Sequence, residues 1–566
     1  MSAIDRGREA LAVWRADAPA DYASASPHLS AALRAHVGSA RATAFAPALG
    51  DFGRAVAAVV EPAAATMERH HREFPAHVAF DGIGTETHEI EFHPAYREAG
   101  RAVWASGLLS LGRGGATAFE QASLFYVLSN VGEGGHACPA VCTAGLARAV
   151  ERRGSAGLVD AYLPGLLETD FDRCLRGSQF LTEVQGGSDV GANAMVAEAD
   201  PGEPGAWRLS GEKWFCSVAD ADLFAVTARP AGAEPGTRGL GCFLVPRRLP
   251  DGGLNGFRIR RLKDKFGTRC LASAEIDFDD AIAWPIGAVE EGFRVAVEEL
   301  LDTSRWLNAV GSTGIMRRAY LEASSFARHR EAFGRSIGGF PLVRSQLASM
   351  KLDEFAALSS TFVLTSLQER RDAGTASEEE SAAYRILVNA NKYVTSIDAT
   401  DVVHRGIEAL GGNGTIEDFS ALPRLYRDAI VYESWEGTHN VLCAQVQRDL
   451  GHRGLLAPLE AWVLRALEES EGDVEAARAA YASLAPEMRE SVAGAERGSV
   501  AFRSQLETLV RVIQSIGLAT EAARGGAEER AAADAFVERH LGGWRAGRNS
   551  QMAPARVDAL IGPDVD

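Results

Sequence analysis

The carboxylate of Glu436 is the strongest candidate for acid–base chemistry in the sequence. It lies in the stretch Tyr432-Glu-Ser-Trp-Glu-Gly-Thr-His-Asn440, directly before Gly437, where the backbone can approach a ligand closely. Apolar neighbours such as Trp435 and Val441 would bury it in part, and burial raises the pKa of a carboxyl group toward the range of a general base. A solvent-facing carboxylate at a helix start explains the same residues about as well.

Two earlier stretches combine small residues with groups that could hold a flat ring. Leu181-Thr-Glu-Val-Gln-Gly-Gly-Ser-Asp189 has two glycines beside hydroxyl side chains, although by itself it is typical of a polar turn. Gly211-Glu-Lys-Trp-Phe-Cys-Ser217 places an aromatic pair beside small polar residues. A strand with a buried tryptophan is the alternative interpretation of the second stretch.

Three later stretches each have a chemical and a purely structural interpretation. Asp302-Thr-Ser-Arg305 could form a local ion pair one helical turn apart. In Arg328-His-Arg-Glu-Ala-Phe-Gly334 the guanidinium of Arg330 could bind a pyrophosphate, or the helix could simply end at the glycine. Gly406-Ile-Glu-Ala-Leu-Gly-Gly-Asn-Gly414 resembles a phosphate-binding loop, but helix termination accounts for its glycines too.

The elements around these stretches change in character along the chain. Short apolar runs at Leu223 to Ala228 and Cys242 to Val245, and the alternation from Ala274 to Phe278, predict strands separated by Gly- and Pro-rich turns. Apolar residues at helical spacing predict helices on both sides, for example Phe502 to Ile516. Several short strands with turn signals favour a small β-barrel or sandwich.

The sequence therefore predicts a mainly α protein with a central β-domain and an additional C-terminal helical block. A loop is expected around Asp81 to Thr85, and the last dozen residues are expected to be frayed. The predicted boundaries are an N-terminal helical extension at 1–90, an N-terminal α-domain at 91–177, a middle β-domain at 178–285, a C-terminal α-bundle at 286–450, and an extra helical domain with a frayed tail at 451–566.

Composition and charge exclude several classes of protein. A net charge of −18 over 566 residues argues against a general electrostatic grip on nucleic acid or an anionic membrane. Seven cysteines without a CxxC pair give neither a disulfide framework nor a zinc ribbon. His136, Cys138 and Cys142 lack an evident fourth ligand, so core packing is expected there and no metal. The absence of a signal peptide or a long apolar run predicts a cytoplasmic protein without a transmembrane helix.

Taken in order, the six stretches resemble the signature of the acyl-CoA dehydrogenase family across residues 90 to 450. The family's patterns T-E-x-x-x-G-S-D, K-x-W-x-T, D-x-x-R, R-x-x-F-G, G-G-x-G and E-G-T are matched, the second only loosely, by Thr182 to Asp189, Lys213 to Ser217, Asp302 with Arg305, Arg330 to Gly334, Gly411 to Gly414, and Glu436 to Thr438. Within the family, the chain is most similar to the adaptive-response, AidB-like branch. The similarity lies in the sequences from Glu183 to Asp189 and from Leu422 to Tyr426 and in the additional C-terminal block.

The resemblance implies a fold, a cofactor and a reaction. It implies an N-terminal helical domain, a middle β-barrel and a C-terminal helical bundle, with FAD between barrel and bundle in a homotetramer. The implied cofactor-binding residues are Leu181, Thr182, Ser188, Trp214, Phe215, Ser217, Arg330, Phe333, Gly411, Gly412, Thr438 and Asn440. The implied substrate-binding residues are Ser188, Asp302, Arg305 and Gly437.

The implied reaction is α,β-dehydrogenation of an acyl thioester, in most cases an acyl-CoA, to the trans-2-enoyl thioester. Glu436 would remove the α-proton while flavin N5 accepts the β-hydride, and an electron-transfer flavoprotein or another acceptor would take the electrons. Some members of the family place the base before the D-x-x-R arginine, but Ser304 occupies that position here.

Three positions depart from the family pattern, and two other functions stay open. Glu408, Pro341 and Thr415 replace a usual Gln, a usual Gln and a usual aromatic residue, which affects cofactor holding and pocket shape. A carrier-protein thioester is an alternative substrate. The AidB-like resemblance also suggests a nucleic-acid-associated flavoprotein with weak dehydrogenase activity, although the only late basic cluster consists of arginines 539, 545, 548 and 556. An oxygen-using oxidase or monooxygenase is the third possibility.

Overall fold

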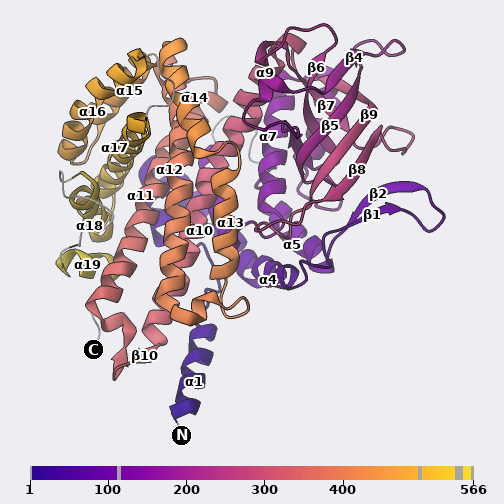
Figure 1. Ribbon diagram of the computed structural model, residues 1–566. Helices are drawn as coiled ribbons and strands as arrows, with labels where there is room; N and C mark the ends of the chain where they lie inside the picture. Colours follow the sequence, from indigo (N-terminus) through magenta and orange to yellow (C-terminus); the bar gives the residue numbers. More distant parts are fainter. Residues whose placement is uncertain (1–2, 111–116, 495–499, 542–551, 553, 563–566) are drawn as a thin grey trace. The chain divides into compact units, whose positions relative to one another are not determined.

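The computed structural model describes residues 3–110, 117–494, 500–541, 552 and 554–562, and the chain divides into two compact units. We call the first the bundle unit; it consists of Met1–Ala57, Gly114–Gly132 and Asn308–Asp566. The second, the barrel unit, consists of Ala58–Arg113 and Glu133–Leu307. Each unit is therefore assembled from segments that lie far apart in the sequence (Figure 1).

The barrel unit contains a seven-stranded sheet that closes on itself. Its strands are β3 Gly177–Phe180, β4 Val196–Ala199, β5 Trp207–Ser217, β6 Leu223–Pro230, β7 Gly241–Pro246, β8 Phe257–Leu262 and β9 Ser273–Pro285. They are ordered β3-β6-β4-β5-β9-β7, and the further pairing of β6 with β7 completes the ring. Residues 223–228 of β6 are all buried because both faces of the strand are covered: Leu223 packs in the core shared with α7 and α8, and Phe224, on the opposite face, packs against Phe257. The predicted central β-domain is confirmed.

Helices and a hairpin accompany the barrel. The helices are α4 Glu61–Arg69, α5 Pro94–Ala105, α7 Ala137–Arg153, α8 Ala156–Leu166 and the short α9 Gly292–Val295. Leu146 and Val150 of α7 and Leu158 and Leu163 of α8 share a core with barrel residues such as Leu244. The hairpin of β1 Ala76–Phe80 and β2 Glu86–Glu91 corrects the expectation of helix around the Asp81 loop. Strand β2 is almost entirely polar and β1 is a short, mostly apolar run, so neither shows the alternation that signals a half-buried strand.

The bundle unit is almost entirely helical. Its helices are α1 Ala3–Ala16, α2 Pro27–Val37, α3 Ser39–Ala55, α6 Ala118–Leu128, α10 Asp302–His329 (of which residues 302–307 belong to the barrel unit), α11 Pro341–Asp372, α12 Glu378–Leu410, α13 Leu422–Ser434, α14 His439–His452, α15 Leu456–Glu469, α16 Glu475–Ala493, α17 Val500–Arg524, α18 Ala527–Phe536 and α19 Pro554–Ile561. A two-residue turn joins β10 Glu331–Ala332 to β11 Arg335–Ser336.

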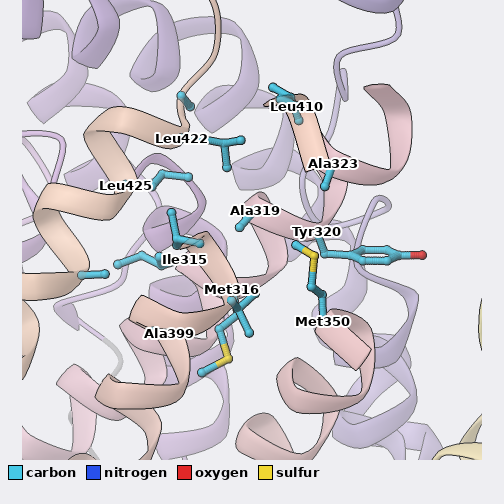
Figure 2. Close-up of a cluster of buried hydrophobic side chains, with 14 of the residues drawn as sticks. Ile315, Met316, Ala319, Tyr320, Ala323, Met350, Ala399, Leu410, Leu422 and Leu425 are labelled. Carbon is cyan, nitrogen blue, oxygen red and sulfur yellow. The ribbon is translucent and has the colours of Figure 1, made fainter. Parts of the chain in front are cut away.

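The long helices begin and end where local chemistry dictates. Ser377 and Glu380 form a reciprocal capping box at the start of α12, and Gly411 ends that helix with a φ of 61°. Pro341 occupies the first turn of α11, where a missing N–H costs little. Helices α10 to α13 then pack around a core that includes Met316, Met350 and Leu425 (Figure 2). This core includes Tyr432 near the end of α13, and the candidate catalytic loop follows that end, between α13 and α14.

The C-terminal helices pack directly against α11. Residues Leu352 and Phe355 of α11 share a buried cluster with Phe536 of α18 and Leu560 of α19. Near the middle of the same helix, the buried carboxylate of Glu521 lies 3.3 Å from His28 and accepts a hydrogen bond from Ser359 at 2.7 Å. The expectation of a frayed tail is wrong for residues 554–561, which form α19.

One helical run has the length and composition of a membrane span. It covers Ser39–Arg69 with a mean hydropathy of 1.2. Of its most apolar 18-residue window, 28% is buried inside the protein, and the run includes the buried residues Leu49, Phe52 and Val56.

Candidate active site

Glu436 lies in the four-residue loop between α13 and α14, in a conformation that a glutamate rarely adopts. Its φ is +60°, and the following Gly437 has a φ of +107°. A left-handed backbone at a non-glycine residue costs about 1–3 kcal/mol and persists only where the surrounding structure imposes it. The Glu436 side chain is half-buried, as predicted for a base, and the adjacent Trp435 ring stacks on Tyr432.

The loop is tied to α12 by the buried ammonium of Lys392. Lys392 Nζ donates to the backbone oxygen of Glu433 at 2.8 Å and to that of Gly437 at 3.1 Å. The Glu433 carboxylate in turn accepts hydrogen bonds from Thr400 and, at 2.7 Å, from His439 Nε2. Burial opposes ionisation of Glu433, but these two hydrogen bonds outweigh it and lower its pKa. Both flanks of Glu436 are therefore fixed by side chains.

The glycine-rich stretch after α12 precedes α13, at the other end of that helix from the Glu436 loop, and offers open backbone. A Cβ placed on Gly411 or Gly412 would meet no atom within 4 Å, whereas one on Gly414 would lie 2.3 Å from a backbone oxygen of Ile407. Gly414 is thus required by packing, and Gly411 is required by its positive φ. Packing does not explain Gly412, which is consistent with close approach of a ligand. Thr438 caps α14 and is exposed, as is Asn440.

The residues that depart from the family pattern have ordinary structural roles. The side chain of Glu408 accepts a hydrogen bond from Gln346 at 3.2 Å on an exposed surface. The hydroxyl of Thr415 donates to the backbone oxygen of Gly412 at 2.9 Å. These contacts place a carboxylate and a hydroxyl next to the open glycines, where the family pattern has an amide and an aromatic ring.

Arg330 and Phe333 lie at the β10–β11 hairpin. Phe333 and Gly334 occupy the turn with φ values of +55° and +87°, the mirror-image geometry that two-residue hairpins favour. The Phe333 ring is 98% exposed, and Arg330 is exposed as well. The Phe333 ring lies edge-on to Phe340 at a centroid distance of 6.2 Å, and the rest of its surface is open to a bound molecule or a second subunit.

In the barrel unit, the Leu181–Asp189 segment is held by a buried ion pair. Lys213 Nζ lies 2.8 Å from the Glu183 carboxylate and donates to the backbone oxygen of Leu181 at 3.3 Å. Burial lowers the pKa of Lys213 even though Glu183 opposes that shift. Asn193 donates to the same Leu181 oxygen at 2.7 Å. The segment leaves Ser188 exposed and Thr182 half-buried at its surface.

The predicted aromatic platform lies on β5, next to this segment. Trp214 donates its backbone N–H to Thr182 at 2.9 Å, while Phe215 is 54% exposed. The ammonium of Lys263 lies 3.5 Å from the centroid of the Trp214 ring. The Ser217 hydroxyl is 3.0 Å from that of Ser273 on β9. The barrel unit thus brings Leu181, Thr182, Trp214 and Phe215 together.

Asp302 and Arg305 lie at the start of α10 and are both buried. They are 3.7 Å apart, with 1% and 4% of their surfaces exposed. The hydroxyl of Ser304 between them accepts a hydrogen bond from Gln179 at 2.7 Å, so the alternative base position is taken by a neutral group. The pair sits inside its unit, apart from the exposed Ser188.

The cysteines considered for metal binding pack in the core of the barrel unit. The sulfurs of Cys138 and Cys142 are 3.8 Å apart, and His136 Nε2 donates to the backbone oxygen of Tyr96 at 2.8 Å. Within the described ranges, no group of three His, Cys, Asp or Glu side chains could hold a metal ion.

Sequence reasoning missed Lys392 and the Glu183–Lys213 pair as structural supports. The one local indication for Lys392 is its position in a stretch of α12 in which the surrounding residues, such as Ala390 and Tyr393, are buried. One of its partners, Glu433, lies on α13 and the other, Gly437, in the loop after it, and no spacing rule along the chain relates them to Lys392.

Comparison with known proteins assigns the three domains. The model for the acyl-CoA dehydrogenase C-terminal domain matches residues 290–451, and that for the middle domain matches 178–281. The N-terminal domain of the adaptive response protein AidB matches 18–173.

Similar proteins point to the same family. AidB of Escherichia coli K12 is 35% identical over 66% of this chain and 69% of its own length. Acyl-CoA dehydrogenase family member 11 of Caenorhabditis elegans is 36% identical over 55% of this chain and 51% of its own. The structure of C. elegans ACDH-11 in complex with C11-CoA superposes with a TM-score of 0.82 at 27% identity, covering 91% of both chains. The domain matches, the likeness to AidB and the helix–barrel–helix fold show that this chain belongs to the acyl-CoA dehydrogenase family.

Proposed function

We propose that the chain catalyses FAD-dependent α,β-dehydrogenation of an acyl-CoA, with Glu436 as the base. The observation that carries the proposal is the half-buried Glu436 carboxylate on a left-handed backbone, flanked by two carbonyls that a buried lysine binds. Such backbone strain is concentrated at active sites, and a member of this family needs a carboxylate base there.

The described residues fit the cofactor that the family uses. The exposed backbone of Gly411 and Gly412, with Arg330, Thr438 and Asn440, would hold the adenine diphosphate half of FAD. Leu181, Thr182, Trp214, Phe215 and Ser217 would hold the flavin ring. Bound FAD would supply the hydride acceptor for the β-carbon. The fully exposed Phe333 suits a composite site in a homotetramer, where one subunit contacts the cofactor of another.

The proton step falls to the loop around Glu436. The α-proton of a thioester is too weakly acidic for an unassisted carboxylate, so the thioester oxygen must be polarised as the proton leaves. The backbone N–H of Glu436 is suited to that task because it is part of the loop that carries the base. The left-handed backbone sets the relative direction of this N–H and of the carboxylate.

Acyl-CoA is the favoured substrate class. The C. elegans protein that shares the fold over 91% of both chains has C11-CoA bound in its structure. An acyl thioester of a carrier protein would react with the same base and differ only in the group that carries the acyl chain. The electrons would leave to an electron-transfer flavoprotein or another acceptor.

The test is the anaerobic visible spectrum of the purified protein with a panel of straight and branched acyl-CoAs that includes the C11 chain. A flavin band near ~450 nm that one acyl-CoA bleaches supports the proposal. Glu436→Gln should retain the flavin and lose bleaching by about 10³-fold, since general-base groups contribute on that order. Normal bleaching by Glu436→Gln, or a protein that cannot bind FAD, would refute it. Peroxide release on air reoxidation would indicate an oxidase instead.

The nucleic-acid alternative finds little support in the described part of the C-terminal block. Arg539 is 4% exposed, and Arg556 pairs with Asp534 at 2.6 Å and with Glu538 at 3.2 Å. Arg545 and Arg548 lie outside the described residues. Retention of duplex DNA in a gel shift at ~50 mM salt, with steep loss at higher salt, is the result that would revive it.

A further inference from the structure

Lys392 is a buried cation that donates hydrogen bonds to the end of α13 and to the loop that follows it. None of its surface is exposed, and a buried ammonium is costly unless its hydrogens are bonded. It projects from the middle of α12, the helix that packs against both α13 and α14. Its position therefore gives it access to the junction between these two helices.

Its two backbone acceptors lie on opposite sides of Glu436. Glu433 precedes Glu436 in the last turn of α13, where backbone oxygens lack donors within the helix and carry the negative end of its dipole. Gly437 follows Glu436 directly. The distances of 2.8 Å and 3.1 Å show that one ammonium binds both.

We propose that Lys392 is a positioning residue for the base: by binding the Glu433 and Gly437 oxygens together, it holds Glu436 in its left-handed conformation and fixes the direction of the carboxylate. This inference rests on the proposed function of Glu436. It assigns to Lys392 no contact with substrate or cofactor.

A second tie acts on the same loop through a side chain. Thr400 and His439 hold the Glu433 carboxylate, which fixes the end of α13 but leaves Gly437 unbound. Removing this tie should disturb Glu436 less than removing the ammonium that binds both flanks. Thr400→Val, which keeps the shape of the side chain, therefore gives a graded comparison.

The experiment uses the FAD-loaded protein with Lys392→Met, which keeps the length of the side chain and removes its donors. Two rates are measured: reduction of the flavin by the best acyl-CoA, and exchange of the α-proton of a 3-thiaacyl-CoA in D₂O. The second ligand can lose its α-proton but is not dehydrogenated, so its exchange reports the base alone. Both rates should fall about 100-fold, the loss that a displacement of about 1 Å can cause. Flavin content and the Kd of the 3-thiaacyl-CoA should change less than about threefold.

Lys351→Met is the matched control. Lys351 is also a buried lysine of the bundle unit, and it binds the backbone oxygen of Leu560 at 2.7 Å, in the contact with α19. Its loss should lower thermal stability without changing α-proton exchange. Lys392→Arg, which keeps donors in place, should recover at least about tenfold of the lost exchange rate.

The outcomes separate the two claims. Unchanged α-proton exchange in folded Lys392→Met, with an inactive Glu436→Gln, would overturn the positioning role and leave the function standing. Activity in Glu436→Gln would overturn the function itself. A parallel rise in KM and loss of flavin without a drop in kcat would show a merely structural lysine. If Lys392→Met does not fold, Lys392→Gln, which keeps one donor amide, should show an intermediate loss of exchange, and wild-type exchange there would refute the proposal.

Discussion

Two loops of this molecule are each held by a buried lysine, but the lysines are neutralised differently. Under the Leu181–Asp189 segment, Lys213 faces the carboxylate of Glu183 at 2.8 Å. Under the Glu436 loop, Lys392 binds two backbone oxygens near the end of α13. A charge pair in the barrel stabilises a fixed surface. The Lys392 ammonium instead binds two backbone oxygens and so determines the path of the backbone. This arrangement suits a loop that must orient the carboxylate of a base.

The largest effect on stability is expected from breaking the charge pair in the barrel unit. Lys213→Met leaves the Glu183 carboxylate buried without its cation, a change that costs about 3–5 kcal/mol. Thermal or urea unfolding measures this loss. The double variant Lys213→Met with Glu183→Gln should recover part of it, because it removes the unpaired charge while the amide oxygen still accepts from one of the backbone N–H groups of Ala194 and Met195. A single variant as stable as wild type would show that the pair contributes little.

The next largest effect is a loss of stability at low pH, which we expect to arise in the core of the barrel unit and not in the Glu436 loop. Burial lowers the pKa of His136 to about 4, below its unfolded value near 6.5. The unfolded chain therefore takes up a proton first as the pH falls. Stability present above pH 6.5 is lost progressively toward pH 4, by about 3 kcal/mol in total. Unfolding curves between pH 7.5 and 4.5 measure the slope, and His136→Gln should flatten it; an equal slope in both proteins would contradict this assignment.

A smaller effect on stability distinguishes two glycines after α12, Gly411 and Gly412, from Gly187 in the Leu181–Asp189 segment. Gly411→Ala forces a side chain into a φ of +61° and should cost about 1 kcal/mol, although no atom obstructs the new Cβ. Gly412→Ala, which has neither strain nor a clash, should leave stability unchanged and weaken FAD binding. In the barrel, Gly187→Ala places a Cβ 2.7 Å from the Thr182 hydroxyl and should cost stability through packing. Melting temperatures with and without FAD separate the three cases.

The smallest effect on stability is expected at the hairpin. Phe333→Ala removes a ring that is 98% exposed, so the unfolding free energy of the isolated chain should change by less than about 0.5 kcal/mol. If a second subunit or its cofactor covers this ring, flavin retention and the oligomeric state in size-exclusion chromatography should change nonetheless. Arg335→Ala on the same hairpin serves as a control. A variant with normal flavin content and assembly would leave the exposure of Phe333 unexplained.

Sequence reasoning succeeded where the signal is local. The strands at Leu223 and Cys242 and the helix around Phe502 follow from apolar spacing, and all three are present. The β1–β2 hairpin was missed because neither strand alternates between apolar and polar residues: β1 is short and mostly apolar, and Ile90 is the single apolar residue of β2. At the site, the position of Glu436 beside Gly437 follows from the motif. The role of Lys392 does not, since a contact between α12 and the α13–α14 loop exists only after the helices have packed.

The burial of Glu521 beside His28 has a consequence for any shortened form of the chain. A protein trimmed after α14 would keep every residue of the family motifs, yet it would expose Leu352 and Phe355 of α11 to water and remove the carboxylate that faces His28. Such a fragment would expose a continuous apolar surface along α11, and we expect it to aggregate. The C-terminal helices therefore form part of the core of the bundle unit and are not a detachable module.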